Sequence, residues 1–303
     1  MSAGDVVVVG SLNMDLVVRA PRLPAPGETI LGGAFATVPG GKGGNQAVAA
    51  ARLGARTAMV GRVGDDAFGR ALRAGLEADG IDCAAVRDLR GEATGVALIV
   101  VDDDGRNGIV VAPGANARLA PDDVPEAVLA GASVVALQLE VPLAVVEATA
   151  RRARALGRTV VLNPAPARPL PPALLADADL LVPNEIEAGM LTGVAVDSID
   201  RAFDAGARLR EQGAHTVLVT LGERGVVLVS AEGARHFPAR SVKAVDTTAA
   251  GDTFIGGLCA ALARGRPLPD AIGFAQAAAA ISVTRPGAQP SIPWAREVVA
   301  TAP

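Results

Sequence analysis

Short apolar runs alternate with helix-like segments along most of the chain. Six runs rich in Val and Leu have the length of buried strands, and they lie at 6–9, 57–63, 134–139, 159–162, 180–182 and 216–220. Between them lie helical candidates at 45–53, 67–79, 142–156, 184–191 and 199–212. Strands that alternate with helices of this length predict parallel crossover units. We therefore expect a three-layer α/β/α sandwich with a mostly parallel central sheet.

Two stretches, about 13–38 and 94–112, carry β-branched residues and turn signals without a helix between them. The turn signals are Pro26-Gly27 and Asp104-Gly105, and they predict hairpins outside the main sheet. Open α/β folds bind ligands at the carboxyl edge of the sheet, so hairpins placed there would act as a lid. After residue 231 the sequence predicts a turn, apolar helices at 251–263 and 268–283, and a Gly/Pro-rich tail. Residues 1–303 thus form a single predicted domain with a lid.

The composition narrows the class of protein. Half of the 303 residues are hydrophobic but aromatics reach only 2%, which predicts a core of small aliphatic side chains. The net charge is -4 and the basic residues are scattered, which argues against a nucleic-acid partner. The N-terminus lacks the features of a signal peptide, and no uncharged run reaches the ~18 residues of a membrane span. Cys83 and Cys259 form neither a disulfide framework nor a metal knuckle, so we expect a cytoplasmic protein without a membrane partner.

The segment 245–254 places small residues directly before an apolar helix, with Asp252 in the first helical turn. Unpaired N–H groups and the helix dipole make such a terminus an anion site where a phosphate could dock. Ordinary helix capping also favours an Asp in the first turn. On this segment alone, both interpretations stay open.

A second glycine-rich segment, 39–46, opens the helix at 45–53. It is not a Walker A loop, because Gly41-Lys42 is followed by Gly43 rather than Ser or Thr, and it does not match the dinucleotide fingerprint. Lys42 and Asn45 would suit a polyhydroxylated ligand, as would Asn13 and Asp15 after the first strand. The alternative is that these are turn-forming residues.

Several motifs taken together resemble the ribokinase/PfkB-type carbohydrate kinases. They are Gly-Gly-Lys-Gly at 40–43 and Asp-Thr-x-x-x-Gly-Asp at 246–252, with Asn-Pro-Ala at 163–165, Pro-Asn-Glu at 183–185, Thr-Leu-Gly at 220–222 and Gly-Ala-Gln-Pro-Ser at 287–291. The likeness runs essentially end to end. Each tripeptide alone is weak evidence, whereas their joint order and spacing is specific to the family.

The resemblance implies roles for the sugar side of the site. The sugar-binding residues would be Asn13, Asp15, Gly41, Lys42, Gly43, Asn45, Glu140 and Asp252. Asp252 would be the catalytic base, and the N–H groups of Ala249, Ala250 and Gly251 would stabilise the transferring phosphoryl group. Many relatives carry Gly where this chain has Ala249. For Glu140, the alternative is that it merely starts the following helix.

The resemblance also implies a nucleotide side and two kinds of metal. The nucleotide residues would be Asn184, Thr220, Gly222, Gly225, Gly251 and Gln276. Mg²⁺ would arrive with ATP and be held largely by its phosphates. A monovalent-cation site, for K⁺ as an activator, would comprise Asp246, Thr248, Ser282, Arg285, Gly287 and Ser291.

By the same resemblance, the reaction would be ATP-dependent phosphorylation of the O5 hydroxyl of D-ribose. The segments 94–97 and 114–116 favour ribose, with 2-deoxyribose or fructose behind it. A nucleoside is less favoured because Phe35 is the only aromatic residue of the expected lid. A non-catalytic sugar-binding regulator is the alternative from another class, and retention of Asp252 argues against it. We also expect a homodimer formed through the lid.

Overall fold

The computed structural model describes residues 5–300, and its largest element is a nine-stranded sheet. The strand order is β13-β12-β11-β10-β9-β8-β1-β4-β5, and all neighbours from β5 to β11 pair in parallel. The strands are β1 (Val6–Val9), β4 (Thr57–Gly64), β5 (Asp82–Leu89), β8 (Val134–Leu137), β9 (Thr159–Leu162), β10 (Leu180–Leu181), β11 (Thr216–Thr220), β12 (Val226–Ser230) and β13 (Gly233–Phe237). Antiparallel β12 and β13 form one edge of the sheet.

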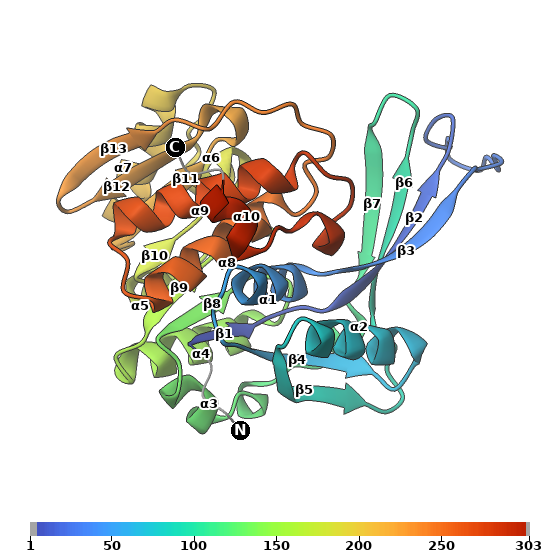
Figure 1. The fold of residues 1–303 in the computed structure, drawn as a ribbon, viewed down its shortest axis with the longest axis horizontal. Helices are drawn as coiled ribbons and strands as arrows, with labels where there is room; N and C mark the ends of the chain where they lie inside the picture. Colours follow the sequence, from blue (N-terminus) through green and yellow to red (C-terminus); the bar gives the residue numbers. More distant parts are fainter. Residues whose placement is uncertain (1–4, 301–303) are drawn as a thin grey trace.

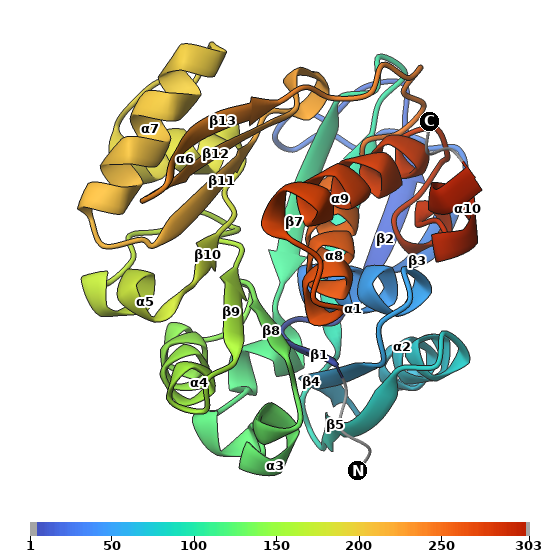
Figure 2. The same cartoon turned by 60° about the vertical axis from the view of Figure 1, so that its left-hand side comes forward.

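Helices cover both faces of this sheet (Figure 2). One face carries α1 (Lys42–Arg52), α2 (Ala67–Ala78), α8 (Ala250–Ala263) and α9 (Leu268–Ser282), with α10 (Ala295–Ala300) against α9. The other carries α3 (Glu126–Ala130), α4 (Leu143–Ala155), α5 (Pro172–Asp177), α6 (Glu185–Thr192) and α7 (Ile199–Glu211). Strand β1 serves both hydrophobic cores, because Val6 and Val8 face one and Val7 and Val9 the other. The predicted three-layer sandwich is confirmed.

A separate four-stranded sheet projects from the main body as an arm (Figure 1). Its order is β3-β2-β6-β7, with β2 (Asn13–Arg19), β3 (Phe35–Gly40), β6 (Gly95–Val101) and β7 (Asn107–Ala112). Each half is an antiparallel hairpin, and parallel pairing of β2 with β6 joins them. Both predicted hairpins are therefore present. No helix between residues 5 and 300 is long and apolar enough to cross a bilayer.

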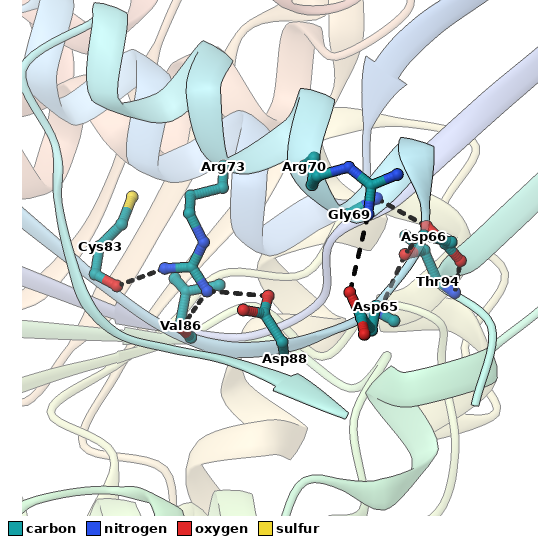
Figure 3. A network of polar contacts seen from close by, with 10 residues as sticks. Asp65, Asp66, Gly69, Arg70, Arg73, Cys83, Val86, Asp88 and Thr94 are labelled. Atoms are coloured by element: carbon teal, nitrogen blue, oxygen red, sulfur yellow. Dashed lines mark hydrogen bonds and ion pairs between the residues drawn. The ribbon is translucent and has the colours of Figure 1, made fainter. Parts of the chain in front are cut away.

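The small sheet is fixed to the main body at the start of β6 (Figure 3). Asp66 caps the N-terminus of α2 by accepting a hydrogen bond from the Gly69 amide at 2.8 Å. The same carboxylate accepts from the Thr94 amide at 2.8 Å and from its hydroxyl at 2.7 Å. The Thr94 hydroxyl in turn accepts from the Gly64 amide at 2.9 Å. One carboxylate thus joins α2, the end of β4 and the base of the arm.

Some strands and one helix boundary were not predicted correctly from the sequence. Strands β5 and β13 lie at the two edges of the sheet and carry charged residues such as Asp82, Arg87 and Arg235, which interrupt their apolar pattern. Strand β12 is a continuous apolar run that was not assigned to a strand from the sequence. Helix α1 begins at Lys42 rather than at residue 45, because Gly43 and Gly44 belong to its first turn and not to a loop. A Cβ at Gly43 would lie 2.6 Å from the Ser11 amide nitrogen, so only glycine fits there.

Helices α1 and α8 cross at very short distance. A Cβ added to Gly256 of α8 would lie 2.4 Å from the Ala49 Cβ and 2.7 Å from the Gln46 carbonyl oxygen of α1. Asp252 lies one turn before Gly256 on the same side of α8, so this crossing brings it to the N-terminal part of α1.

We predict that Gly256→Ala lowers the free energy of unfolding by about 1–3 kcal/mol, because the added methyl group forces two packed helices apart. Urea denaturation measures the change. Gly273→Ala in α9 is the matched control, since a Cβ there meets nothing within 4 Å, and the gain in helix propensity raises stability by up to about 1 kcal/mol. Equal stability of the two variants would contradict the crossing described here.

Candidate active site

The predicted sugar-side residues come together where four segments converge. Asn13 and Asp15 lie at the start of β2, Gly41, Lys42, Gly43 and Asn45 at the start of α1, Glu140 shortly after β8, and Asp252 in the first turn of α8. A hollow of about 330 Å³ adjoins Asn13 and Glu140, and Val111 of β7 lines it from the arm. A second hollow of about 390 Å³, lined by segments such as 167–170 and 209–212, holds none of the predicted residues.

Asp252 is buried, with 8% of its surface exposed. Its Oδ2 accepts a hydrogen bond from Asn45 Nδ2 at 3.0 Å, and its Oδ1 accepts from Gln46 Nε2 at 3.0 Å. Burial raises the pKa of Asp252, while the charge of Lys42 and the two amide donors act in the opposite direction. This carboxylate therefore depends on neutral donors and a nearby ammonium for its ionisation.

Lys42 supplies the positive charge of this cluster. Burial alone would lower the pKa of its ammonium, but the carboxylates of Asp252, Glu140 and Glu187 outweigh that effect, so the pKa is raised. Glu140 accepts from the Lys42 backbone amide at 3.0 Å and from the Ser11 hydroxyl at 2.5 Å. Its side chain thus faces α1. The N-cap residue of α4 is Pro142, so Glu140 does not occupy the first position of the following helix.

Asp15 lies in a partly buried site with two other carboxylates nearby. Its carboxylate lies against the backbone of Gly40, where an added Cβ would be 2.4 Å from Oδ2. Burial raises the pKa of Asp15 from 3.8 to about 7, and repulsion from Glu140 and Asp252 adds to the effect. The carboxylates of Asp252, Glu140 and Glu187 thus share the Lys42 ammonium, and Asp15 adds a fourth acid to the cluster, which leaves acceptor capacity for a ligand rich in hydroxyl donors.

Asn13 is held by a buried neighbour, Asn116, which the sequence-based prediction did not assign to the site. Asn116 Nδ2 donates to Asn13 Oδ1 at 2.8 Å and to the Leu12 carbonyl at 3.0 Å, and its Oδ1 accepts from the Leu12 amide at 2.9 Å. These bonds fix which way the Asn13 amide points. Its Nδ2 is then directed away from Asn116 and is available to a ligand.

The turn before α8 has an unusual backbone. Ala249 has φ 58° and ψ 14°, the one positive φ of a non-glycine residue among those described, which costs roughly 1 kcal/mol. The Ala250 amide donates to the Thr247 carbonyl at 3.2 Å. Within residues 5–300, the amides of Gly251 and Asp252 have no protein acceptor. Together with the helix dipole they form a place for an anionic oxygen.

The predicted nucleotide residues Asn184 and Thr220 are neighbours, joined by a parallel bridge. Asn184 caps α6 reciprocally with Glu187: each side chain accepts from the other residue's amide at 2.8 Å. Gly222 and Gly225 have φ 55° and 97° in the turn after β11. Glu187 is buried beside Lys42 and Asp252, and burial raises its pKa. Sequence reasoning missed this carboxylate, although the capping-box spacing from Asn184 was visible.

The Gln276 side chain is hydrogen-bonded to the backbone of a neighbouring segment. Its Nε2 donates to the carbonyls of Phe237 and Pro238 at 3.0 and 3.3 Å. These bonds hold the chain that follows β13 against α9. Contact with an adenine therefore stays a prediction for this residue.

The predicted cation residues form two adjoining segments. Asp246 Oδ1 accepts from the Thr248 amide at 2.9 Å and from its hydroxyl at 2.6 Å, while Oδ2 accepts from the Gly287 amide at 2.9 Å. Burial acts to raise the pKa of Asp246, but these hydrogen bonds outweigh it and lower the pKa. The Arg285 amide donates to the Ser282 carbonyl at 3.0 Å, and the Ser291 hydroxyl to the Ala288 carbonyl at 2.8 Å.

The oxygen atoms of these two segments are potential metal ligands, and their chemical type distinguishes between a monovalent cation and Mg²⁺. In the described part of the chain, no three Asp, Glu, His or Cys side chains gather as a metal cage. The cation segments contribute carbonyl and hydroxyl oxygens and the Asp246 carboxylate, which are oxygen ligands of the type that a large, weakly hydrated monovalent ion accepts. Mg²⁺ prefers a small octahedral site completed by water and substrate phosphates.

Comparison with known proteins agrees with this geometry. The pattern that defines the pfkB family carbohydrate kinases matches residues 3–295, so the chain belongs to this family of sugar kinases. The resemblance inferred from the motifs is confirmed.

Individual relatives narrow the class further. A ribokinase from Haemophilus influenzae is 44% identical over 294 residues, which cover 96% of each chain. A deoxyribokinase from Salmonella typhi is 38% identical and covers 95% of each. The solved structure of Arabidopsis thaliana ribokinase complexed with ribose and ATP is similar with a TM-score of 0.92, at 35% identity and 98% coverage of both chains.

We predict that Asp15→Asn stabilises the protein at pH 8. The parent loses stability as the pH rises from about 4 to about 7, because Asp15 ionises in the unfolded chain at 3.8 but in the folded protein only near 7. The variant should be more stable by on the order of 2 kcal/mol at pH 8, after allowance for solvent screening. At pH 4 the two proteins should unfold at the same urea concentration. An equal difference at both pH values would contradict the assigned cause.

Proposed function

We propose that this protein transfers the γ-phosphoryl group of ATP to the O5 hydroxyl of D-ribose. The observation that carries the proposal is the position of Asp252, which lies beside the unpaired amides of the α8 N-terminus and within the polar cluster of Asp15, Lys42 and Asn45. A carboxylate, an anion site and a set of hydroxyl-binding groups are the parts that phosphoryl transfer to a sugar requires. Full-length similarity to ribokinases supports the choice of sugar.

Asp252 acts as the base. Its carboxylate is far less basic than an alkoxide, so it receives the proton late, after the sugar oxygen has begun to bond to phosphorus. The negative charge that develops on the phosphoryl oxygens is stabilised by the amides of Gly251 and Asp252 and by the Lys42 ammonium. Mg²⁺ that arrives with ATP would neutralise phosphate charge. Asn184 and Thr220, which are joined by a parallel bridge, would contact the nucleotide phosphates.

The small sheet acts as a lid over the sugar. Asp15 reaches the site from β2, and its sheet neighbours Val38 and Ala97 lie on the same face. Phe35 pairs with Val18, and alternation along β2 therefore places it on the opposite face from Asp15. No aromatic side chain of the lid can stack on a base from there. This favours a free sugar over a nucleoside.

We further propose that the lid joins two copies of the chain, which act in the cytoplasm. On the lid face opposite Asp15, the side chains of Phe35, Leu98 and Val110 are 64%, 51% and 67% exposed. Leu98 and Val110 are directly paired across β6 and β7. An apolar surface of this kind is stabilised when a second copy covers it.

We predict that Asp252→Asn lowers kcat by roughly 10²- to 10⁴-fold, because the variant cannot accept the proton, while ribose binding stays measurable. ADP formation with ribose, 2-deoxyribose, fructose and adenosine gives both the activity and the preferred substrate. Asp270→Asn is the matched control, since this exposed acid occupies the first turn of the neighbouring helix α9. Activity of Asp252→Asn within a few-fold of the parent would remove the residue from its proposed role.

We also propose that K⁺ binds at Asp246 and the neighbouring carbonyls and activates the enzyme. Turnover should then be at least a few-fold higher in K⁺ than in Na⁺ at equal ionic strength. Trp294 provides a second measurement, because it is the chain's single Trp and lies three residues after Ser291. The guanidinium carbons of Arg52 and Arg296 lie 5.5 and 5.6 Å from the centre of its ring. Its fluorescence should change on titration with K⁺ and not with Na⁺. Equal turnover in both salts would count against activation.

A further inference from the structure

Three buried amide side chains form a hydrogen-bonded group that contacts Asp252. Gln46 of α1 and Gln138, one residue beyond β8, are 0% exposed, and Asn163, one residue beyond β9, is 6% exposed. Gln46 is their common member. Its Oε1 accepts from Gln138 Nε2 at 2.6 Å, and its Nε2 donates to Asn163 Oδ1 at 3.3 Å and to Asp252 Oδ1 at 3.0 Å.

The direction of these hydrogen bonds is set by the backbone. Asn163 Nδ2 donates to the Val182 carbonyl at 3.0 Å, and a carbonyl oxygen can only accept. Asn163 must therefore turn its Oδ1 towards Gln46, and Gln46 must present its NH₂ group to it. The same NH₂ group faces Asp252. A carbonyl at the end of β10 thus determines that Asp252 receives a donor.

Asp252 has few other ways to stabilise its negative charge. In the described part of the chain it forms no ion pair, and its direct side-chain donors are Asn45 and Gln46. The charged groups that influence it or share its field are Lys42, Glu140, Glu187 and Asp15. Three of these four are acidic and act against its ionisation.

The two donors to Asp252 differ in whether a bound substrate can contact them. Asn45 belongs to the sugar-side cluster, and its Oδ1 is buried without a protein partner, so this amide is placed to interact with a bound sugar. Gln46 is fully enclosed by protein groups, and both ends of its amide are occupied. Its bond to Asp252 can therefore persist whether or not substrate is present.

We propose that Gln46 is a positioning residue for the phosphoryl transfer, which keeps the Asp252 carboxylate ionised and holds one of its oxygens so that the other faces the sugar hydroxyl. The inference rests on the proposed function and adds to it a residue that touches no substrate. Asn163 supports the same arrangement through Gln46.

Gln46→Met tests this role, because it keeps the shape of the side chain and removes the donor. We expect kcat to fall about tenfold or more at pH 6.5, with a smaller loss at pH 8.5, since the base of the variant needs a higher pH to ionise. The KM for ATP should change little. Thr149→Val is the matched control: this buried hydroxyl of α4 has no hydrogen-bond partner and lies on the other side of the sheet, so its pH profile should equal that of the parent.

A second measurement does not depend on activity. In protein labelled with ¹³C-aspartate, the Asp252 carboxyl signal is assigned by its loss in Asp252→Asn, and its titration should move to higher pH in Gln46→Met. If Gln46→Met does not fold, Asn163→Leu carries the test, with a shift in the same direction. An unchanged titration together with an unchanged pH profile would overturn the inference. Absence of kinase activity in the parent with a shifted titration would overturn the proposed function alone.

Discussion

The close crossing of α1 and α8 at Gly256 is the contact on which the site depends. Asp252, the proposed base, lies on α8, and its hydrogen-bond donors, Asn45 and Gln46, lie on α1. The two helices are separated by about 200 residues of sequence, and backbone-to-methyl contact at the crossing sets their distance. Because packed helices cannot approach by fractions of an ångström without strain, the position of Asp252 relative to α1 is determined by the core and not by a flexible loop.

The same crossing brings together several carboxylates whose negative charge the protein alone does not neutralise. Glu140, Glu187 and Asp252 act on one ammonium, that of Lys42, and Asp15 is repelled by two of them. Burial raises the pKa of Asp15, Glu187 and Asp252. Hydroxyl groups of a sugar can donate hydrogen bonds to these carboxylates and so stabilise their charge. The buried carboxylates that lower the stability of the free protein are therefore the same groups that are available to bind a ligand.

Sequence patterns predicted the α/β sandwich and the hairpins well, because buried parallel strands such as β1 and β11 are continuous apolar runs. They missed β5 and β13, whose charged residues reflect an edge position that only the assembled sheet reveals. The motifs located Asp252 and Lys42. They did not reveal Gln46, Gln138 or Asn116, because amides whose partners are distant in sequence carry no local signal; Glu187 was visible only as an ordinary helix cap.

The attachment of the arm to the main body has a mechanical consequence. Thr94, just before β6, is tied to Asp66 and Gly64 of the main body. The Ala115 amide, just after β7, donates to the Ala93 carbonyl at 2.8 Å, so the two ends of the β6–β7 hairpin are tied to each other and, through Thr94, to the rigid layers. A swing that began below these points would break several buried hydrogen bonds at once. The lid movement proposed for this arm would therefore bend its strands above Gly95 and would not rotate the whole arm about its base.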